Sequence, residues 1–286
     1  MSVPVIFDRK AYGARRLRDR PSFLAEEVAE NLALRLGAIN RRFEHGLDLG
    51  SRQQVFAAIA PRAQAWTRTA LAGNACMGLI ADEENLPFAP GRFDVVVSAL
   101  SLHAVNDLPG ALAQIRRSLK PDGLFLAALF GGETLQELRG AFAAAEADIL
   151  GGITPRVAPF ADVRALGGLL QRAGFALPVT DSEKTVVNYR AFATLVADLR
   201  GLGETNVLAG RARNVLRRDV LEAMLASHPR DTSGTMLRTT FEVIYLTAWA
   251  PHESQQKPLR PGSAAARLAD ALGTTELPAG EAPGRA

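Results

Sequence analysis

The string Leu47-Asp48-Leu49-Gly50 could place a carboxylate and a conformationally free glycine beside a bound ligand. It ends a short apolar run and precedes a stretch that predicts a short helix, from about Gln53 to Ala60. In doubly wound folds ligands bind where such a strand meets the next helix, because exposed amides and the helix N-terminus face them. An ordinary strand-to-helix turn gives a similar string about as often, so later motifs have to decide between the two interpretations.

His103 is the histidine nearest to this presumed site. Imidazoles titrate near neutral pH, which makes it a candidate catalytic base or substrate contact. The alternative is a loop histidine packed on the edge of a sheet. His45, His228 and His252 are too scattered to predict a metal site. Cys76, the single cysteine, is more typical of a small buried side chain than of a nucleophile.

The elements that have to position these residues alternate between strands and helices. Phe93–Ser98 and Leu124–Phe130 are typical of buried strands, Asp107–Leu119 repeats apolar residues on one helical face, and Lys120–Gly123 has the composition of a turn. We also predict strands ending near 49 and at 65–71, 77–81, 175–187 and 240–249, and helices at 21–37, 134–148, 162–172, 190–202, 211–227 and 264–272.

Strands that alternate with helices of this length predict an α/β fold with a doubly wound, mostly parallel sheet. The helices at 190–239 are expected to form an insertion before the last strand. The chain therefore divides into an N-terminal helical segment at 1–43, a main domain at 44–250 and a proline-containing tail at 251–286.

Composition bounds the class of protein. The 286 residues are 48% hydrophobic and 22% charged, as in globular domains, and no apolar run reaches the roughly 18 residues of a transmembrane segment. One cysteine excludes a disulfide framework and fits a reducing compartment. No apolar signal segment is present near the start, and Asp8 and Asp19 argue against a mitochondrial transit peptide. We therefore expect a cytoplasmic protein.

Arginine concentrates in two segments, Arg9–Arg20 and Arg211–Arg218. Such clusters can bind nucleic acid, but Asp19 lies within the first and Asp219 follows the second. We favour solvated helix faces and expect no nucleic-acid partner.

Three motifs place the chain beside a known family. An acidic stretch with Leu86-Pro87-Phe88, the string Phe93-Asp94-Val95-Val96-Val97-Ser98 and the string Leu119-Lys120-Pro121-Asp122-Gly123 follow one another in this order. Over about 44–150 the chain resembles the class I S-adenosylmethionine-dependent methyltransferases, which implies a Rossmann-like sheet and S-adenosylmethionine as cofactor.

A narrower resemblance covers most of the chain. It rests on strings such as Ile6-Phe7-Asp8-Arg9 and Gly132-Glu133-Thr134-Leu135-Gln136 and on the tail residues His252–Gln255 and Arg260–Ala264. These are similar to two groups, the methyltransferase-like assembly factors of respiratory complex I, implicated in hydroxylating an arginine, and the malonyl-carrier-protein O-methyltransferases of biotin synthesis. The tail favours the assembly factors. The implied partner is a complex I subunit or an acyl carrier protein.

The resemblance also implies roles for single residues. Asp48 and Gly50 would lie beside the amino-acid part of the cofactor, Asp82 would accept a hydrogen bond from the adenine amino group, and Ser98 and Leu100 would line the reaction pocket.

Two cofactor-binding determinants of the family pattern are missing. Arg52 and Gln54 stand where the family has its second and third glycines, and the segment Trp66–Thr69 offers no acid for the ribose hydroxyls. The leading hypothesis is an S-adenosylmethionine-dependent enzyme that modifies a protein during complex I assembly. The alternatives are a non-catalytic assembly scaffold that has lost cofactor binding and a malonyl-carrier-protein O-methyltransferase.

Overall fold

The computed structural model describes residues 4–18, 20–73, 78–256 and 267–275. Cys76 and the Arg260–Ala264 motif lie outside these residues. The chain forms two compact units, Met1–His252 and Glu253–Ala286. In the second, the predicted helix at 264–272 is the short α9, Leu268–Leu272.

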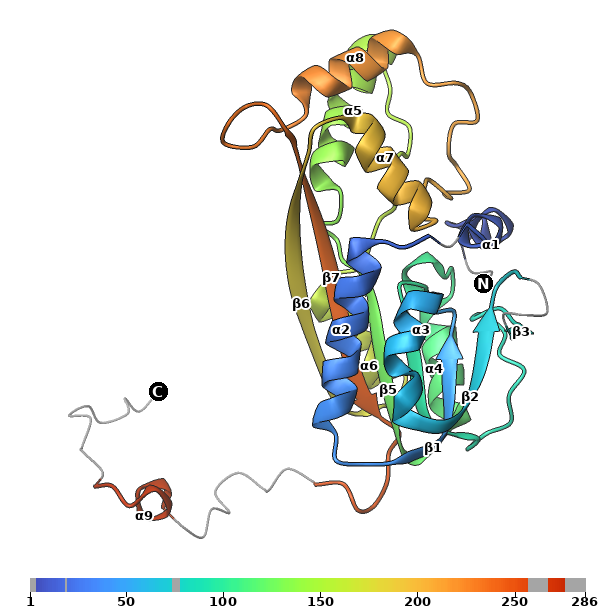
Figure 1. The fold of residues 1–286 in the computed structure, drawn as a ribbon, viewed down its shortest axis with the longest axis vertical. Helices are drawn as coiled ribbons and strands as arrows, with labels where there is room; N and C mark the ends of the chain where they lie inside the picture. Colours follow the sequence, from blue (N-terminus) through green and yellow to red (C-terminus); the bar gives the residue numbers. More distant parts are fainter. Residues whose placement is uncertain (1–3, 19, 74–77, 257–266, 276–286) are drawn as a thin grey trace, which may run out of the picture. The chain divides into compact units, whose positions relative to one another are not determined.

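One seven-stranded sheet runs through the first unit (Figure 1). Its strand order is β3-β2-β1-β4-β5-β7-β6; β1 to β5 pair in parallel and β7 is antiparallel to both neighbours. The strands are β1 (Phe43–Leu49), β2 (Ala63–Ala70), β3 (Leu79–Ile80), β4 (Phe93–Ala99), β5 (Leu119–Phe130), β6 (Ala176–Tyr189) and β7 (Leu237–Trp249). The predicted α/β, doubly wound and mostly parallel sheet is confirmed.

Helices cover both faces of this sheet. One face packs against α2, α3, α5, α7 and α8, and the other packs against α4 and α6. The helices of this unit are α1 (Arg9–Arg16), α2 (Phe23–Ala38), α3 (Gln53–Ile59), α4 (Leu108–Ser118), α5 (Gln136–Leu150), α6 (Val163–Arg172), α7 (Phe192–Gly201) and α8 (Arg218–Ser227). As predicted, α7 and α8 form an insertion between the last two strands.

Strands β4 and β5 contain long apolar stretches because both of their faces are buried. In β4, Val95 and Val97 belong to the core on one face while Val96 belongs to the core on the other. Alternate residues of a strand point to opposite faces, so a run without polar interruptions marks a strand between two helical layers.

Two predicted elements differ from the observed ones. The expected turn at Lys120–Gly123 lies inside β5, where the pairing with β4 jumps from Phe93–Leu119 to Val95–Leu124. The intervening residues bulge from the strand, with Asp122 at a φ of 60°. The helix predicted from 211 begins only at Arg218.

The chain order of the strands reverses between β1 and β4, the two neighbours at the centre of the sheet. The chain leaves β1 on one side and β4 on the other, which opens a crevice at the carboxyl ends of these strands. The residues singled out in the sequence, from Asp48 to His103, therefore converge on this edge.

A buried carboxylate on α5 fixes the loop that follows it. Glu146 is fully buried and accepts hydrogen bonds from the Thr154 amide at 2.6 Å and from two nitrogens of Arg156 at 2.6 and 2.8 Å. Burial by itself would raise the pKa of the Glu146 carboxyl, but the bonds from Thr154 and Arg156 outweigh it and leave that pKa below the usual 4.5. The ionised form is thus the one that the folded state stabilises.

We expect Glu146→Gln to lower the free energy of unfolding by about 2–3 kcal/mol at pH 7, because Arg156 loses its charged partner. A folded-state pKa below the unfolded one gives stability that is present above pH 4.5 and lost as pH falls through the folded value. Urea unfolding at pH 7 and under acid conditions should therefore show the difference shrinking in acid. The exposed Glu222→Gln is the control, with a change of less than about 0.5 kcal/mol. A pH-independent difference would contradict this account.

Candidate functional site

Gly50 occupies a position that only glycine fits. Its φ of +73° lies in the left-handed region, and a Cβ there would approach the Ser101 hydroxyl to 2.6 Å and a Glu83 carboxylate oxygen to 2.8 Å. The loop after β1 is therefore packed against the loops after β3 and β4. The three loops that would surround a ligand at this edge are in direct contact.

Asp48 is the penultimate residue of β1, and its side chain is 1% exposed. Its Oδ2 accepts a hydrogen bond from Arg68 Nε at 3.0 Å. Burial raises the pKa of the Asp48 carboxyl, and its contacts with Ser51 and Arg68 offset this effect only in part. Arg68 lies in β2, directly opposite Asp48 in the register, within the segment where the family resemblance predicts a ribose-binding acid. The Asp48–Arg68 ion pair occupies this position in place of an acid that could bind the ribose.

The N-terminal helix α1 covers the crevice and neutralises its acids. Arg9 donates to Asp82 at 2.8 Å and to Glu83, and its Nε lies 3.8 Å from Glu84. The Arg9 side chain is only 12% exposed and that of Glu83 only 2%. The carboxylate of Asp82, predicted to bind adenine, is thus engaged by this chain's own arginine.

Arg16 lies two helical turns after Arg9 on the same face of α1 and reaches the other side of the crevice. It donates to the backbone carbonyls of Gly50 and Leu100. Tyr12, which lies between the two arginines, is 1% exposed and donates to the Leu100 carbonyl at 3.1 Å. The crevice is therefore lined by α1 rather than open to solvent along its length.

The space that remains is too small for the predicted cofactor. The cavity bounded by Tyr12, Arg16, Gly50, Glu83 and Ser101 measures about 30 Å³. Pockets for drug-sized ligands measure roughly 300–1,000 Å³, and 30 Å³ is of the order of one or two water molecules. S-adenosylmethionine does not fit in the crevice while α1 occupies it.

Arg52, which replaces a family glycine, contributes to this filling. Its side chain is buried beside the same cavity, and its guanidinium donates to the Gly201 carbonyl at 3.1 Å. The large side chain that departs from the glycine pattern thus ties the β1 loop to the end of α7.

Ser98 and Leu100, predicted to line the reaction pocket, lie inside the protein. The Ser98 hydroxyl donates to the Leu49 carbonyl at 2.9 Å and links β1 to β4. Leu100 is 1% exposed, and its backbone carbonyl accepts hydrogen bonds from Tyr12 and Arg16 of α1. Their roles toward a cofactor remain predictions.

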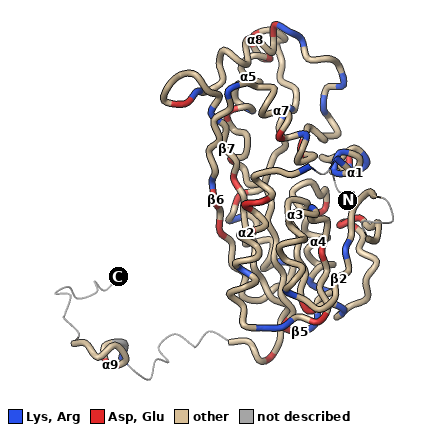
Figure 2. The backbone as a smooth tube through the Cα atoms, in the orientation of Figure 1, with Lys and Arg blue, Asp and Glu red and all other residues tan. Residues whose placement is uncertain are grey.

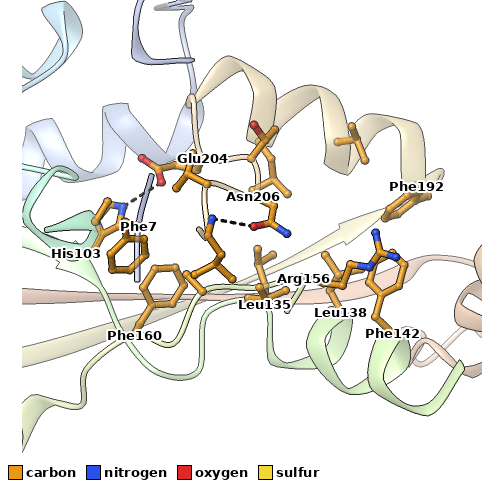
Figure 3. Close-up of a pocket in the computed structure, with 18 residues that line it drawn as sticks. Phe7, His103, Leu135, Leu138, Phe142, Arg156, Phe160, Phe192, Glu204 and Asn206 are labelled. Atoms are coloured by element: carbon orange, nitrogen blue, oxygen red, sulfur yellow. Dashed lines mark hydrogen bonds and ion pairs between the residues drawn. The ribbon is translucent and has the colours of Figure 1, made fainter. Parts of the chain in front are cut away.

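A larger cavity of about 220 Å³ lies beside the crevice, on the side of α5 and α7 (Figure 3). His103 and Glu204 stand at one end of it, and Arg156, Phe142 and Phe192 at the other. Most of the remaining walls are apolar: Phe7, Ala104, Leu135, Leu138, Val157, Ala158, Phe160, Val196, Leu199, Val207 and Leu208.

His103 and Glu204 are hydrogen-bonded to each other in the wall of this cavity. His103 Nε2 lies 3.0 Å from Glu204 Oε2, and the imidazole packs against the rings of Phe130 and Phe160, with centroid separations of 4.8 and 5.6 Å. Of the sequence candidates, His103 is the one that this cavity contains.

Glu204 also contacts the crevice. Its Oε1 accepts from the Tyr12 hydroxyl at 3.2 Å and lies 3.5 Å from Arg16. Burial would raise the pKa of the Glu204 carboxyl, but His103, Arg16 and Arg52 outweigh burial and leave that pKa below its usual value. Glu204 is therefore an anion between the filled crevice and the cavity.

Sequence reasoning missed the contribution of α1 and of Glu204. Arg9, Tyr12 and Arg16 are spaced i, i+3 and i+7, which places them on one helical face, and this signal was available in the basic segment. Glu204 carried no such signal, because its partners lie at positions distant in sequence.

Comparison with known proteins decides the family. Residues 17–178, more than half of the chain, match the sequence family described as "Methyltransferase domain". The chain belongs to the class I S-adenosylmethionine-dependent methyltransferase family. Within this family it is 40% identical over 257 residues to the human protein named arginine-hydroxylase NDUFAF5, mitochondrial, a match that covers 85% of this chain and 74% of that protein.

A second group within the methyltransferase family is also similar. The malonyl-[acyl-carrier protein] O-methyltransferase of Laribacter hongkongensis is 33% identical over 285 residues, covering 91% of this chain and 92% of that enzyme. Among solved structures, the YcgJ protein of Bacillus subtilis aligns with a TM-score of 0.53 at 14% identity, over 78% of this chain and 99% of that one. The structural likeness concerns the fold.

The relatives correct one expectation. The human and zebrafish proteins are named as mitochondrial, so the prediction of a cytoplasmic location is wrong. Asp8 and Asp19, the acidic residues near the start, are therefore no guide to location. Within the described residues, no helix is long and apolar enough to cross a membrane, and no three His, Cys, Asp or Glu side chains form a group that could hold a metal ion.

We expect α1 to compete with S-adenosylmethionine for the crevice. The double substitution Arg9→Gln/Arg16→Gln removes the guanidinium groups that attach α1 to the crevice. This should destabilise the arrangement in which α1 covers the crevice by on the order of 1–3 kcal/mol. Titration calorimetry should then show S-adenosylmethionine binding at least roughly tenfold tighter than to the unaltered chain. Lys10→Gln, exposed on the same helix, is the control. Equal affinities in correctly folded proteins would show that α1 is no barrier.

Proposed function

We propose that this methyltransferase-family protein serves respiratory complex I assembly by binding a complex I subunit and admitting one of its arginine side chains to the cavity beside His103 and Glu204. The observation that carries the proposal is the largely buried, anionic Glu204, its side chain 10% exposed, at the end of an otherwise mostly apolar cavity. The relatives named arginine-hydroxylase, at 37–42% identity, support the choice of arginine.

The two parts of an arginine side chain, its methylene groups and its guanidinium, both match the chemistry of this cavity. Its three methylene groups can pack along apolar walls such as Leu135 and Leu138. Its planar guanidinium can donate two parallel hydrogen bonds to one carboxylate and stack on the aromatic rings around His103. A cavity of about 220 Å³ holds one long side chain but not a larger ligand.

In this proposal His103 positions Glu204. The imidazole holds one carboxylate oxygen at 3.0 Å and is itself fixed by the rings of Phe130 and Phe160. A carboxylate fixed in this way is oriented before the substrate arrives, which reduces the entropy that binding has to overcome.

Assembly without catalysis is a second candidate function, and the filled crevice favours it. S-adenosylmethionine does not fit beside α1, so a protein that keeps α1 in place would act through binding alone. Malonyl-carrier-protein methylation is less favoured, since that reaction needs the methyl donor in the crevice.

We expect Glu204→Gln to reduce complex I assembly in cells that lack the native gene, because a buried amide cannot pair with a guanidinium charge. Native gels of complex I, with mass spectrometry of its subunit arginines, measure the effect. An arginine that carries an added oxygen or methyl group with the unaltered protein, and not with the variant, would support catalysis; restored assembly without modification would support the scaffold.

Two further variants make this test specific. Ala158→Phe fills the cavity without changing a charge and should impair assembly as Glu204→Gln does. Glu44→Gln, an exposed carboxylate in β1, should leave it unchanged. Normal complex I in cells that lack the gene, or in cells with both cavity variants, would overturn the proposal.

A further inference from the structure

Six arginines line one open groove next to the cavity. The groove measures about 710 Å³ and lies between α1, the end of α7 and the segment that leads into α8. Figure 2 shows lysine and arginine gathered on α1 and along that segment. The groove's arginines are Arg15, Arg18, Arg156, Arg200, Arg211 and Arg213, and no acidic residue is among its described lining residues.

The fold brings together the two basic segments that are distant in the sequence. Arg211 donates to Asp8 at 2.9 Å and to the Leu208 carbonyl, which anchors the second segment beside α1. Arg15 donates to the Thr205 carbonyl at 2.7 Å and reaches across the same groove. These bonds hold like charges close to one another.

Three of the six arginines, Arg18, Arg200 and Arg213, are exposed and have no carboxylate within ion-pair distance among the described residues, although Asp8 interacts electrostatically with Arg213. The pKa of Arg15 is lowered, first by burial and then by repulsion from Arg211 and Arg18, with Asp8 acting in the opposite direction. A bound anionic partner would stabilise this concentrated and only partly balanced positive charge.

The groove adjoins the cavity described above. Arg156, Val196, Thr205 and Asn206 line both of them. A polypeptide that sends a side chain into the cavity from this groove runs its neighbouring residues along the arginines.

From this arrangement we infer that the groove binds an acidic segment of the substrate protein, so that the arginine entering the cavity is flanked by Asp or Glu residues. The inference rests on the proposed function and specifies its substrate. A cationic arginine that reaches Glu204 through the groove passes Arg18, Arg200 and Arg213, which have no ion-pair partner among the described residues, and flanking carboxylates turn this repulsion into attraction.

The shape of the surface favours a polypeptide over other anions. A lipid bilayer is flat and meets protruding side chains, whereas these arginines line a concave groove. Single-stranded nucleic acid binds through aromatic stacking platforms as well as charge, and the groove contains no aromatic residue among its described lining. An extended peptide fits a groove and supplies both carboxylates and the arginine.

Four labelled peptides of equal length test the inference on the full chain. They carry a central arginine or its neutral isostere citrulline, flanked either by Asp and Glu or by Asn and Gln. By fluorescence anisotropy we expect the acid-flanked arginine peptide to bind about tenfold tighter than its neutral-flanked counterpart. This ratio should shrink as salt is added.

Matched double variants locate the effect. Arg200→Ser/Arg213→Ser should abolish the preference for acidic flanks. Arg92→Ser/Arg164→Ser, which removes two exposed arginines from outside the groove, should retain it. Thermal unfolding of both variants checks that they fold.

The outcomes separate the two proposals. Equal binding of acid- and neutral-flanked peptides, with arginine still preferred over citrulline, would overturn the groove inference and leave the proposed function standing. Preference for acidic flanks with citrulline bound as well as arginine would support the groove and overturn the proposed function. Tighter binding of phosphatidylglycerol vesicles or a single-stranded oligonucleotide than of the acid-flanked peptide, lost in Arg200→Ser/Arg213→Ser, would overturn the choice of a polypeptide.

Discussion

The placement of one guanidinium among three carboxylates holds the ligand-binding edge of this protein closed. Arg9 lies against Asp82, Glu83 and Glu84, and without it the nearly buried Glu83 would be an unpaired charge away from water. Leaving such a charge unpaired costs several kcal/mol, so α1 and the loop after β3 are stabilised together or separate together.

The same replacement of ligand by protein occurs around the whole crevice. Where the family resemblance implies contacts to a cofactor, Asp48 pairs with Arg68, the carbonyl of Gly50 accepts from Arg16, and Asp82 pairs with Arg9. Buried polar groups need partners, and here arginines of the same chain supply them. The methyltransferase fold is thus kept with most of these polar groups paired inside the protein, although Asp48 Oδ1 is buried without a hydrogen-bond partner among the described residues, and the neighbouring cavity keeps the Glu204 carboxylate in its wall.

Most of the fold could be predicted because its signals are local. The consecutive valines in Phe93–Ser98 and the one-sided helix after Asp107 indicate their own burial. The order of motifs indicated the family. The site was predicted less well. His103 was found as the histidine near the expected pocket, but its partner Glu204 lies 101 residues away and no spacing rule connects them. The exposed helix face expected at Arg9–Arg20 was wrong for Arg9 and Arg16, since their carboxylate and carbonyl partners are formed by tertiary structure.

Glu204 has one oxygen toward His103 and the other toward Tyr12 and Arg16. A cation that pairs with this carboxylate from the cavity does so in competition with Arg16, and part of the attachment of α1 weakens as a result. By thermodynamic reciprocity, whatever loosens α1 strengthens the hold of Glu204 on that cation by the same free energy. The shared Glu204 carboxylate thereby couples binding in the cavity to the attachment of α1 over the crevice.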